Sequence, residues 1–177
     1  MVACPGGGLR ESHRALRGNR TRIVGCRAAR LLSDQAGRKD QTAKVTAVVL
    51  DTNGYAALFA GEPTTVRLLS AAQEIHLPLI VLGELLAGFA AGTRVQKNRD
   101  DLARFMASPS VHVMRLDEKT PHFYADIFVA LRNRGTPIPT NDMWIAALAC
   151  QHRLPLLSFD AHFGAVPGLV LVDQARS

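Results

Sequence analysis

The chain has 177 residues, a length typical of one domain, and 47% of them are apolar, as in ordinary soluble globular proteins. Its three cysteines form no CxxC pair, and its six histidines form neither an HxxxH nor an HExxH pattern. These features argue against a disulfide scaffold and against a zinc site. No run of about 18 uncharged apolar residues is present, so we expect no membrane span. The cysteine usage favours a cytoplasmic protein.

The net charge of +6 resides in the N-terminal segment. Residues 1–44 hold ten Lys/Arg and three Asp/Glu, a net charge of +7, whereas the rest of the chain has a net charge of −1. This basic segment shows neither a helical nor a strand period, which predicts a disordered extension. It could act as an RNA-binding arm or a transit peptide; the simpler interpretations are a solvated tail or a start codon assigned too far upstream. We therefore predict that the folded domain occupies residues 45–177.

From residue 45 onward, strand-like and helix-like segments alternate. The expected strands are residues 45–50, 111–116, 156–158 and 169–172. The expected helices are residues 53–60, 65–74, 79–91, 94–107, 117–133 and about 141–152. Residues 79–91 are apolar all round, which is typical of a buried helix. Strands that alternate with helices predict an α/β fold, a parallel sheet with helices on both faces.

Four carboxylates, referred to below as the four acids, occur where an acidic side chain is costly. Asp51 and Asp160 follow apolar strand segments, Asp142 opens an apolar helix, and Glu84 lies inside the apolar segment 79–91. A carboxylate taken out of water costs several kcal/mol unless a cation compensates it. No lysine or arginine adjoins any of the four acids in sequence, so a divalent metal ion is the simplest partner.

The predicted sheet offers a way to bring these carboxylates together. Ligands of an open parallel sheet bind at the carboxyl ends of its strands, where Asp51 and Asp160 should lie. Asp142 should lie at the same edge because helices of such a sheet start there, and Glu84 would reach it from its helix. Oxygen ligands alone select Mg²⁺ or Mn²⁺, which predicts a metal-dependent hydrolase of phosphodiesters. Ser158 lacks the GxSxG context of a catalytic nucleophile.

Each acid also has a purely structural interpretation. Asp142 could cap its helix, although neighbouring polar residues could serve instead. Asp51 and Asp160 could be ordinary turn residues after their strands, and Glu84 could form a buried ion pair. All of these interpretations would have to hold together for the metal site to vanish.

Four segments that contain these acids resemble the PIN-domain nucleases, and more narrowly the VapC ribonuclease toxins of bacterial toxin–antitoxin pairs. The matching segments are residues 48–53 (VVLDTN), 81–88 (VLGELLAG), 138–147 (IPTNDMWIAA) and 156–163 (LLSFDAHF), with PGL at 167–169. They occur in the family's order at compatible spacing, and the resemblance covers about residues 46–173.

The resemblance implies a PIN fold, RNA cleavage that depends on Mg²⁺ or Mn²⁺, a homodimer, and inhibition by a partner antitoxin. It assigns metal binding and catalysis to Asp51, Glu84, Asp142 and Asp160. Thr52 or Thr140 would orient a carboxylate or a water molecule.

The sequence thus predicts a PIN-fold endoribonuclease that is the toxin of a type II toxin–antitoxin pair. One alternative is a PIN nuclease of RNA maturation or defence without a toxin role, and a small antitoxin gene immediately upstream would argue against it. Another alternative is a catalytically silent PIN module. Protection of the fold against heat by Mn²⁺ would argue against that one.

Overall fold

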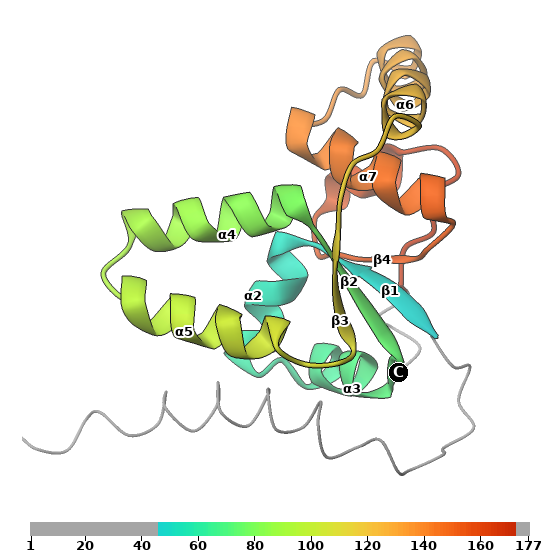
Figure 1. Cartoon of the computed structure of the whole chain (residues 1–177). Helices are drawn as coiled ribbons and strands as arrows, with labels where there is room; N and C mark the ends of the chain where they lie inside the picture. Colours follow the sequence, from blue (N-terminus) through green and yellow to red (C-terminus); the bar gives the residue numbers. More distant parts are fainter. Residues whose placement is uncertain (1–45, 173–177) are drawn as a thin grey trace, which may run out of the picture.

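The computed structural model describes residues 46–172, which fold around one parallel β-sheet (Figure 1). Its strands are β1 (Ala47–Leu50), β2 (Glu74–Pro78), β3 (Val111–Met114) and β4 (Leu156–Leu157), in the order β3-β2-β1-β4. All three pairings are parallel; Val48 lies opposite Ile75, and Leu50 lies opposite Leu157. The parallel α/β sheet predicted from the sequence is therefore confirmed.

Helices connect the strands. They are α2 (Thr52–Ala60), α3 (Pro63–Ala71), α4 (Leu79–Ala91), α5 (Val95–Met106), α6 (Thr120–Arg134) and α7 (Thr140–His152), with the 3-10 helix η1 (Ala161–Ala165) after β4. Three successive β1 residues, Val48, Val49 and Leu50, are buried. Because neighbouring strand side chains point to opposite faces, helices must cover both faces of the sheet at its centre. Each such buried aliphatic side chain contributes about 1.5–3 kcal/mol.

Strand β2 was not predicted. The expected helix 65–74 is shorter at its C-terminal end: α3 ends at Ala71, and Glu74 already belongs to β2. In β2 the buried Ile75 and Leu77 alternate with the half-buried His76. This period of two is the pattern of a strand, but five residues next to a helix give a weak signal. The last expected strand, 169–172, is reduced to one parallel bridge between Leu156 and Leu171.

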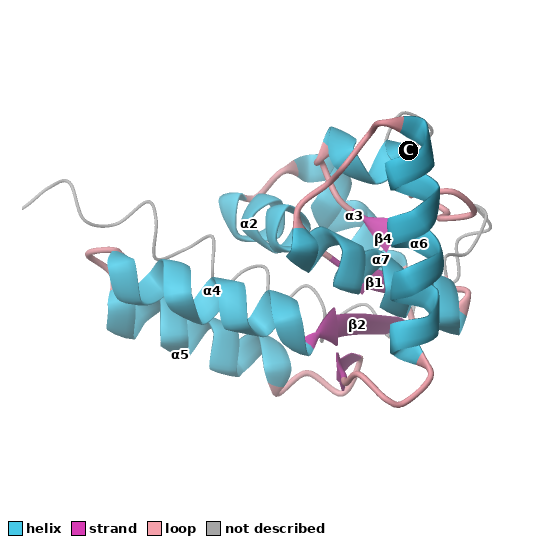
Figure 2. Cartoon of the chain, turned by 90° about the horizontal axis from the view of Figure 1, so that it is seen from above, coloured by secondary structure: helices cyan, strands magenta, loops and turns pink. Residues whose placement is uncertain are grey.

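Helices α4 and α5 lie side by side and extend together away from the sheet (Figures 1 and 2). The prediction that α4 is buried all round is wrong. Val81 and Leu85 are buried, whereas Leu79 and Leu86 are 39% and 38% exposed. The apolar composition of this helix therefore reflects more than packing within the chain. Among the described residues, no helix is long and apolar enough to cross a membrane.

The start of α2 is fixed tightly against the sheet edge. A Cβ added at Gly54 would lie 2.8 Å from the backbone oxygen of Leu157 and 2.8 Å from Cδ1 of Leu50. The helix approaches β1 and β4 this closely because the residue has no side chain. At its other end, Gly61 takes the left-handed conformation with φ of 78° and ends the helix. This close packing holds Asp51, which directly precedes α2, at the carboxyl edge of the sheet.

Candidate active site

Asp51 is a buried carboxylate at the end of β1, next to the end of the neighbouring strand β4. It directly follows β1 and is 3% exposed. The hydroxyl of Ser158, which follows the neighbouring β4, donates a hydrogen bond of 2.7 Å to Oδ2 of Asp51. Burial raises the pKa of Asp51 above its ordinary value, and this hydrogen bond opposes the shift in part. Ser158 is thus a positioning residue that sequence reasoning considered only as a nucleophile.

Glu84 is held from two other helices. The hydroxyl of Thr52 at the start of α2 donates to Oε2 of Glu84, and the amide of Asn141 at the start of α7 donates to Oε1 at 2.7 Å. Glu84 forms no salt bridge with a lysine or arginine of residues 46–172. The ion pair considered as its structural alternative is therefore absent from the described part of the chain. The role expected for Thr52 in orienting a carboxylate agrees with this contact.

Asp142 lies in the first turn of α7, as predicted, and does not cap it. The residue before the helix is Pro139, and no side chain caps the helix end. The Oδ2 atom of Asp142 is buried and has no hydrogen-bond partner. Burial raises the pKa of Asp142 to about 6, followed in importance by the negative charges of Asp160, Asp51 and Glu84. The structure therefore brings the other three acids close enough to Asp142 for their charges to act on it.

Asp160 completes the group from the segment after β4. It was expected directly after that strand, but it lies three residues beyond the strand's end. Its backbone N–H donates to the hydroxyl of Ser158 at 3.0 Å, which ties it to Asp51 through one residue. Its Oδ1 accepts a hydrogen bond of 2.9 Å from the backbone N–H of His162 and so caps η1. This capping contact was not predicted, because Asp160 was considered only as a turn residue after its strand, and it is compatible with a place in the site.

A histidine that was not predicted as a site residue also lies here. Nδ1 of His162 is 3.0 Å from Oδ1 of Asp160 and 3.6 Å from Oδ2 of Asp142. The sequence did hold a signal for it, because His162 is only two residues from Asp160 and therefore shares its turn.

Comparison with known proteins identifies the family of this chain. The sequence model of the PIN domain family matches residues 48–169, which spans all four acids. The chain belongs to the PIN-domain family. It is 26% identical over 128 residues to the protein named ribonuclease VapC5 of Mycobacterium tuberculosis (strain ATCC 25618 / H37Rv), covering 72% of this chain and 93% of the relative.

Solved structures agree with this family assignment at the level of the fold. VapBC2 from Rickettsia felis, bound to a DNA fragment from its promoter, matches with a TM-score of 0.64 and 23% identity. The match covers 71% of this chain and 97% of that one. A toxin–antitoxin complex from Klebsiella pneumoniae matches with a TM-score of 0.50 and 26% identity, covering 70% of this chain and 95% of that one.

The carboxylates of this PIN domain have the chemistry of a divalent metal site. Oδ2 of Asp142 is a buried anionic oxygen without a donor, and none of the four acids forms a salt bridge with a lysine or arginine within residues 46–172. Ligand atoms of Asp142, Asp160 and His162 all lie within 4.8 Å of one another. A cation placed among them would relieve both the missing contact and the repulsion.

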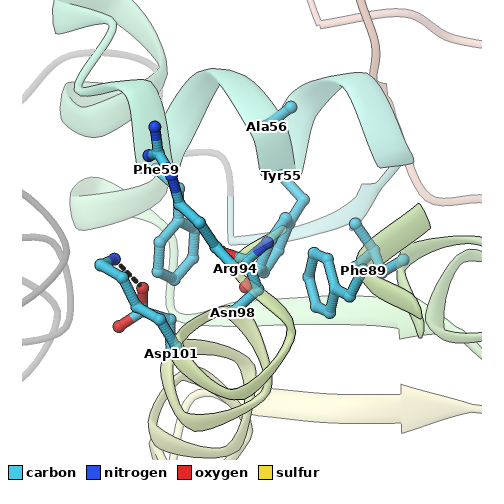
Figure 3. A pocket seen from close by; sticks show the side chains of 9 residues that line it. Tyr55, Ala56, Phe59, Phe89, Arg94, Asn98 and Asp101 are labelled. Carbon is cyan, nitrogen blue, oxygen red and sulfur yellow. Dashed lines mark hydrogen bonds and ion pairs between the residues drawn. The ribbon is translucent and has the colours of Figure 1, made fainter. Parts of the chain in front are cut away.

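The PIN domain has a pocket between α2, α4 and α5 (Figure 3). This pocket of about 220 Å³ contains none of the four acids. Its aromatic wall is formed by Tyr55, Phe59 and Phe89. The cations Arg94 and Lys97 also line this pocket. Elsewhere in the domain, Arg134 at the end of α6 donates a hydrogen bond of 3.5 Å to the backbone oxygen of Ala165 in η1.

Proposed function

We propose that the chain is a Mg²⁺-dependent endoribonuclease and the toxic component of a type II toxin–antitoxin pair, with Mn²⁺ able to replace Mg²⁺. The observation that carries the proposal is Oδ2 of Asp142, which is buried without a hydrogen-bond partner while the negative charges of Asp160, Asp51 and Glu84 act on its carboxylate. The family supports the nuclease class, and the similarity to a protein named ribonuclease VapC5 supports RNA as the substrate.

In this proposal, the four acids hold the metal ion, with Asp51, Glu84 and Asp142 as its principal ligands. The bound ion would polarise the phosphodiester, lower the pKa of water and stabilise the leaving oxygen. Thr52 and Asn141 each satisfy one oxygen of Glu84 with a single hydrogen bond. Each of these oxygens keeps a lone pair that can face the ion. Ser158 fixes Asp51 in the same way.

We assign Asp160 to the attacking water. Its side chain is 29% exposed, compared with 15% for Asp142, so it is the more accessible to solvent. A carboxylate in this position can accept a hydrogen bond from water and aim the oxygen lone pair in line with the scissile bond. The carboxylates would repel RNA in the absence of a cation, so metal and substrate binding should be coupled.

The proposed partners are RNA, a second copy of the chain and an antitoxin. Support for the antitoxin comes from the toxin–antitoxin complex of Klebsiella pneumoniae, which is 26% identical to this chain. The exposed apolar residues Leu79 and Leu86 of α4 are compatible with a further protein contact. A nuclease of RNA maturation without a toxin role would have the same site, so growth arrest on induction in cells separates the two functions.

The first prediction tests the chemistry. Asp51→Asn and Asp142→Asn should each abolish cleavage of a defined RNA in Mg²⁺, because each removes a negative ligand while keeping nearly the same shape. Excess EDTA should abolish cleavage by the unaltered chain, and added Mn²⁺ should restore it. Circular dichroism of both variants provides the control for folding. Undiminished cleavage by either variant would remove that residue from the mechanism, and cleavage in EDTA would contradict metal dependence.

A further inference from the structure

The position of His162 suggests more than a role as a neighbour of the four acids. We propose that Nδ1 of His162 is a direct ligand of the metal ion, so that the site prefers Mn²⁺ over Mg²⁺. This inference rests on the proposed metal-dependent function, which it deepens by adding a nitrogen donor.

The spacing of the donor atoms fits a shared cation. Nδ1 of His162 lies 3.0 Å from Oδ1 of Asp160 and 3.6 Å from Oδ2 of Asp142. Two ligands at right angles, each about 2.1 Å from one ion, lie about 3.0 Å apart. Both distances from Nδ1 are therefore close to those between adjacent ligands around one ion, and all three donor atoms lie within 4.8 Å of one another. No rearrangement of the chain is needed to bring the imidazole into the site.

The unpartnered oxygen of Asp142 favours a cation over a simple hydrogen bond. At 3.6 Å, Nδ1 of His162 is too far from Oδ2 of Asp142 to donate a hydrogen bond to it. Oδ2 is also buried and receives no other donor. A hydrogen bond from the ring to Asp160 would leave this oxygen unsatisfied. An ion bound to both Nδ1 and Oδ2 satisfies the two atoms together.

The backbone holds the ring in place. The N–H of His162 donates to Oδ1 of Asp160 at 2.9 Å, and the next residue, Phe163, is 1% exposed and anchors η1 in the core. His162 itself is 53% exposed, so water and ions can reach it. An anchored backbone with an accessible side chain is the arrangement expected of a ligand that closes the outer side of a metal site.

The nitrogen donor has a chemical consequence. Imidazole binds Mn²⁺ and the later transition metals more readily than Mg²⁺, which prefers oxygen ligands. Removal of the ring should therefore weaken Mn²⁺ binding more than Mg²⁺ binding. His122 on α6 is also exposed and is a matched control, because it has no part in the site.

The test uses the full chain, EDTA-treated and titrated with Mn²⁺ under detection by electron paramagnetic resonance. Mg²⁺ affinity is measured by its competition with Mn²⁺. The unaltered chain and His122→Ala should both show the ¹⁴N electron spin-echo modulation of a directly bound imidazole. His162→Ala should lose this modulation, and its Mn²⁺ affinity should fall about tenfold or more. Its Mg²⁺ affinity should fall by a smaller factor.

A second variant protects the test against failure to fold. His162→Asn places an amide oxygen near the position of Nδ1, so it should bind Mn²⁺ without the imidazole modulation. If the unaltered chain binds Mn²⁺ without this modulation, the ligand role of His162 is overturned while the proposed nuclease function stands. If the unaltered chain binds no Mn²⁺ and no Mg²⁺, both proposals fail.

Discussion

At the scale of single residues, Asp142 shows how the site lowers the stability of the fold. Burial of its carboxylate and the negative charges of three other acids together raise its pKa to about 6. The folded chain therefore binds a proton at Asp142 more strongly than the unfolded chain does. Without a metal ion, ionisation of this residue opposes folding.

The second prediction concerns the pH dependence of stability in EDTA. The pKa of Asp142 rises from 3.8 to about 6 on folding, so its contribution to stability is greatest below pH 3.8 and is lost as the pH rises through 6. The shift corresponds to at most about 3 kcal/mol of unfolding free energy. Asp142→Asn removes this term, and urea unfolding at pH 5 and pH 7.5 should show a gain for the variant that is larger at pH 7.5.

The control for this prediction is metal itself. Mg²⁺ at pH 7.5 should stabilise the unaltered chain and have a much smaller effect on Asp142→Asn, because ligands that bind only the folded state raise its stability. If the variant is no more stable than the unaltered chain in EDTA at pH 7.5, ionisation of Asp142 does not destabilise the folded chain.

At the scale of elements, the site can be anticipated wherever a residue's place follows from strand and helix ends. Asp51 and Asp142 were predicted at the carboxyl edge because one directly follows a strand and the other starts a helix. Glu84 was predicted to lie near them only because a carboxylate inside an apolar helix is unfavourable without a compensating cation. The sequence could not show that Asn141 would reach Glu84, because the two are 57 residues apart and meet only through the packing of α4 and α7.

The fold was predicted with similar limits. The alternation of elements identifies the parallel sheet, but β2 was missed because its short period-two pattern continues directly from the preceding helical segment. The burial of α4 was overestimated because composition reports how apolar a helix is and not what covers it.

The third prediction compares two glycines in helices. Gly54→Ala should destabilise the chain by about 1–3 kcal/mol, because the new Cβ would lie 2.8 Å from the backbone oxygen of Leu157, which cannot move aside cheaply. Gly88→Ala in α4 is the matched control: nothing lies within 4 Å of its Cβ, so a gain of about 0.5–1 kcal/mol is expected. Urea unfolding of both variants measures the difference. Equal effects of the two substitutions would contradict the close approach of α2 to β4.

At the scale of the whole molecule, the basic segment predicted at residues 1–44 lies outside the described residues. The buried core of the described part extends from Val48 to Val166, and the family match covers residues 48–169. The family match supports, without testing it, a folded unit that begins near residue 45. We continue to propose this domain boundary.

The fourth prediction follows from that boundary. Deletion of residues 1–43 should change the free energy of unfolding by no more than about 0.5 kcal/mol and should leave the rate of RNA cleavage unchanged. Urea unfolding and cleavage of the same RNA by the two chains measure this. A role as an RNA-binding arm would instead appear as weaker RNA binding with a shallower dependence on salt in the shortened chain. Loss of folding would show that the domain begins earlier.

The four acids do not all lie on the same part of the fold. Glu84 alone rides on α4, which runs beside α5 as a protruding hairpin, while Asp51, Asp142 and Asp160 belong to the sheet edge and the elements next to it (Figure 1). If the four acids are the proposed ligands, a tilt of this hairpin would displace Glu84 and leave the other three in place. A protein that binds the outer side of α4 would therefore act on the proposed metal site through Glu84 and its contacts with Thr52 and Asn141.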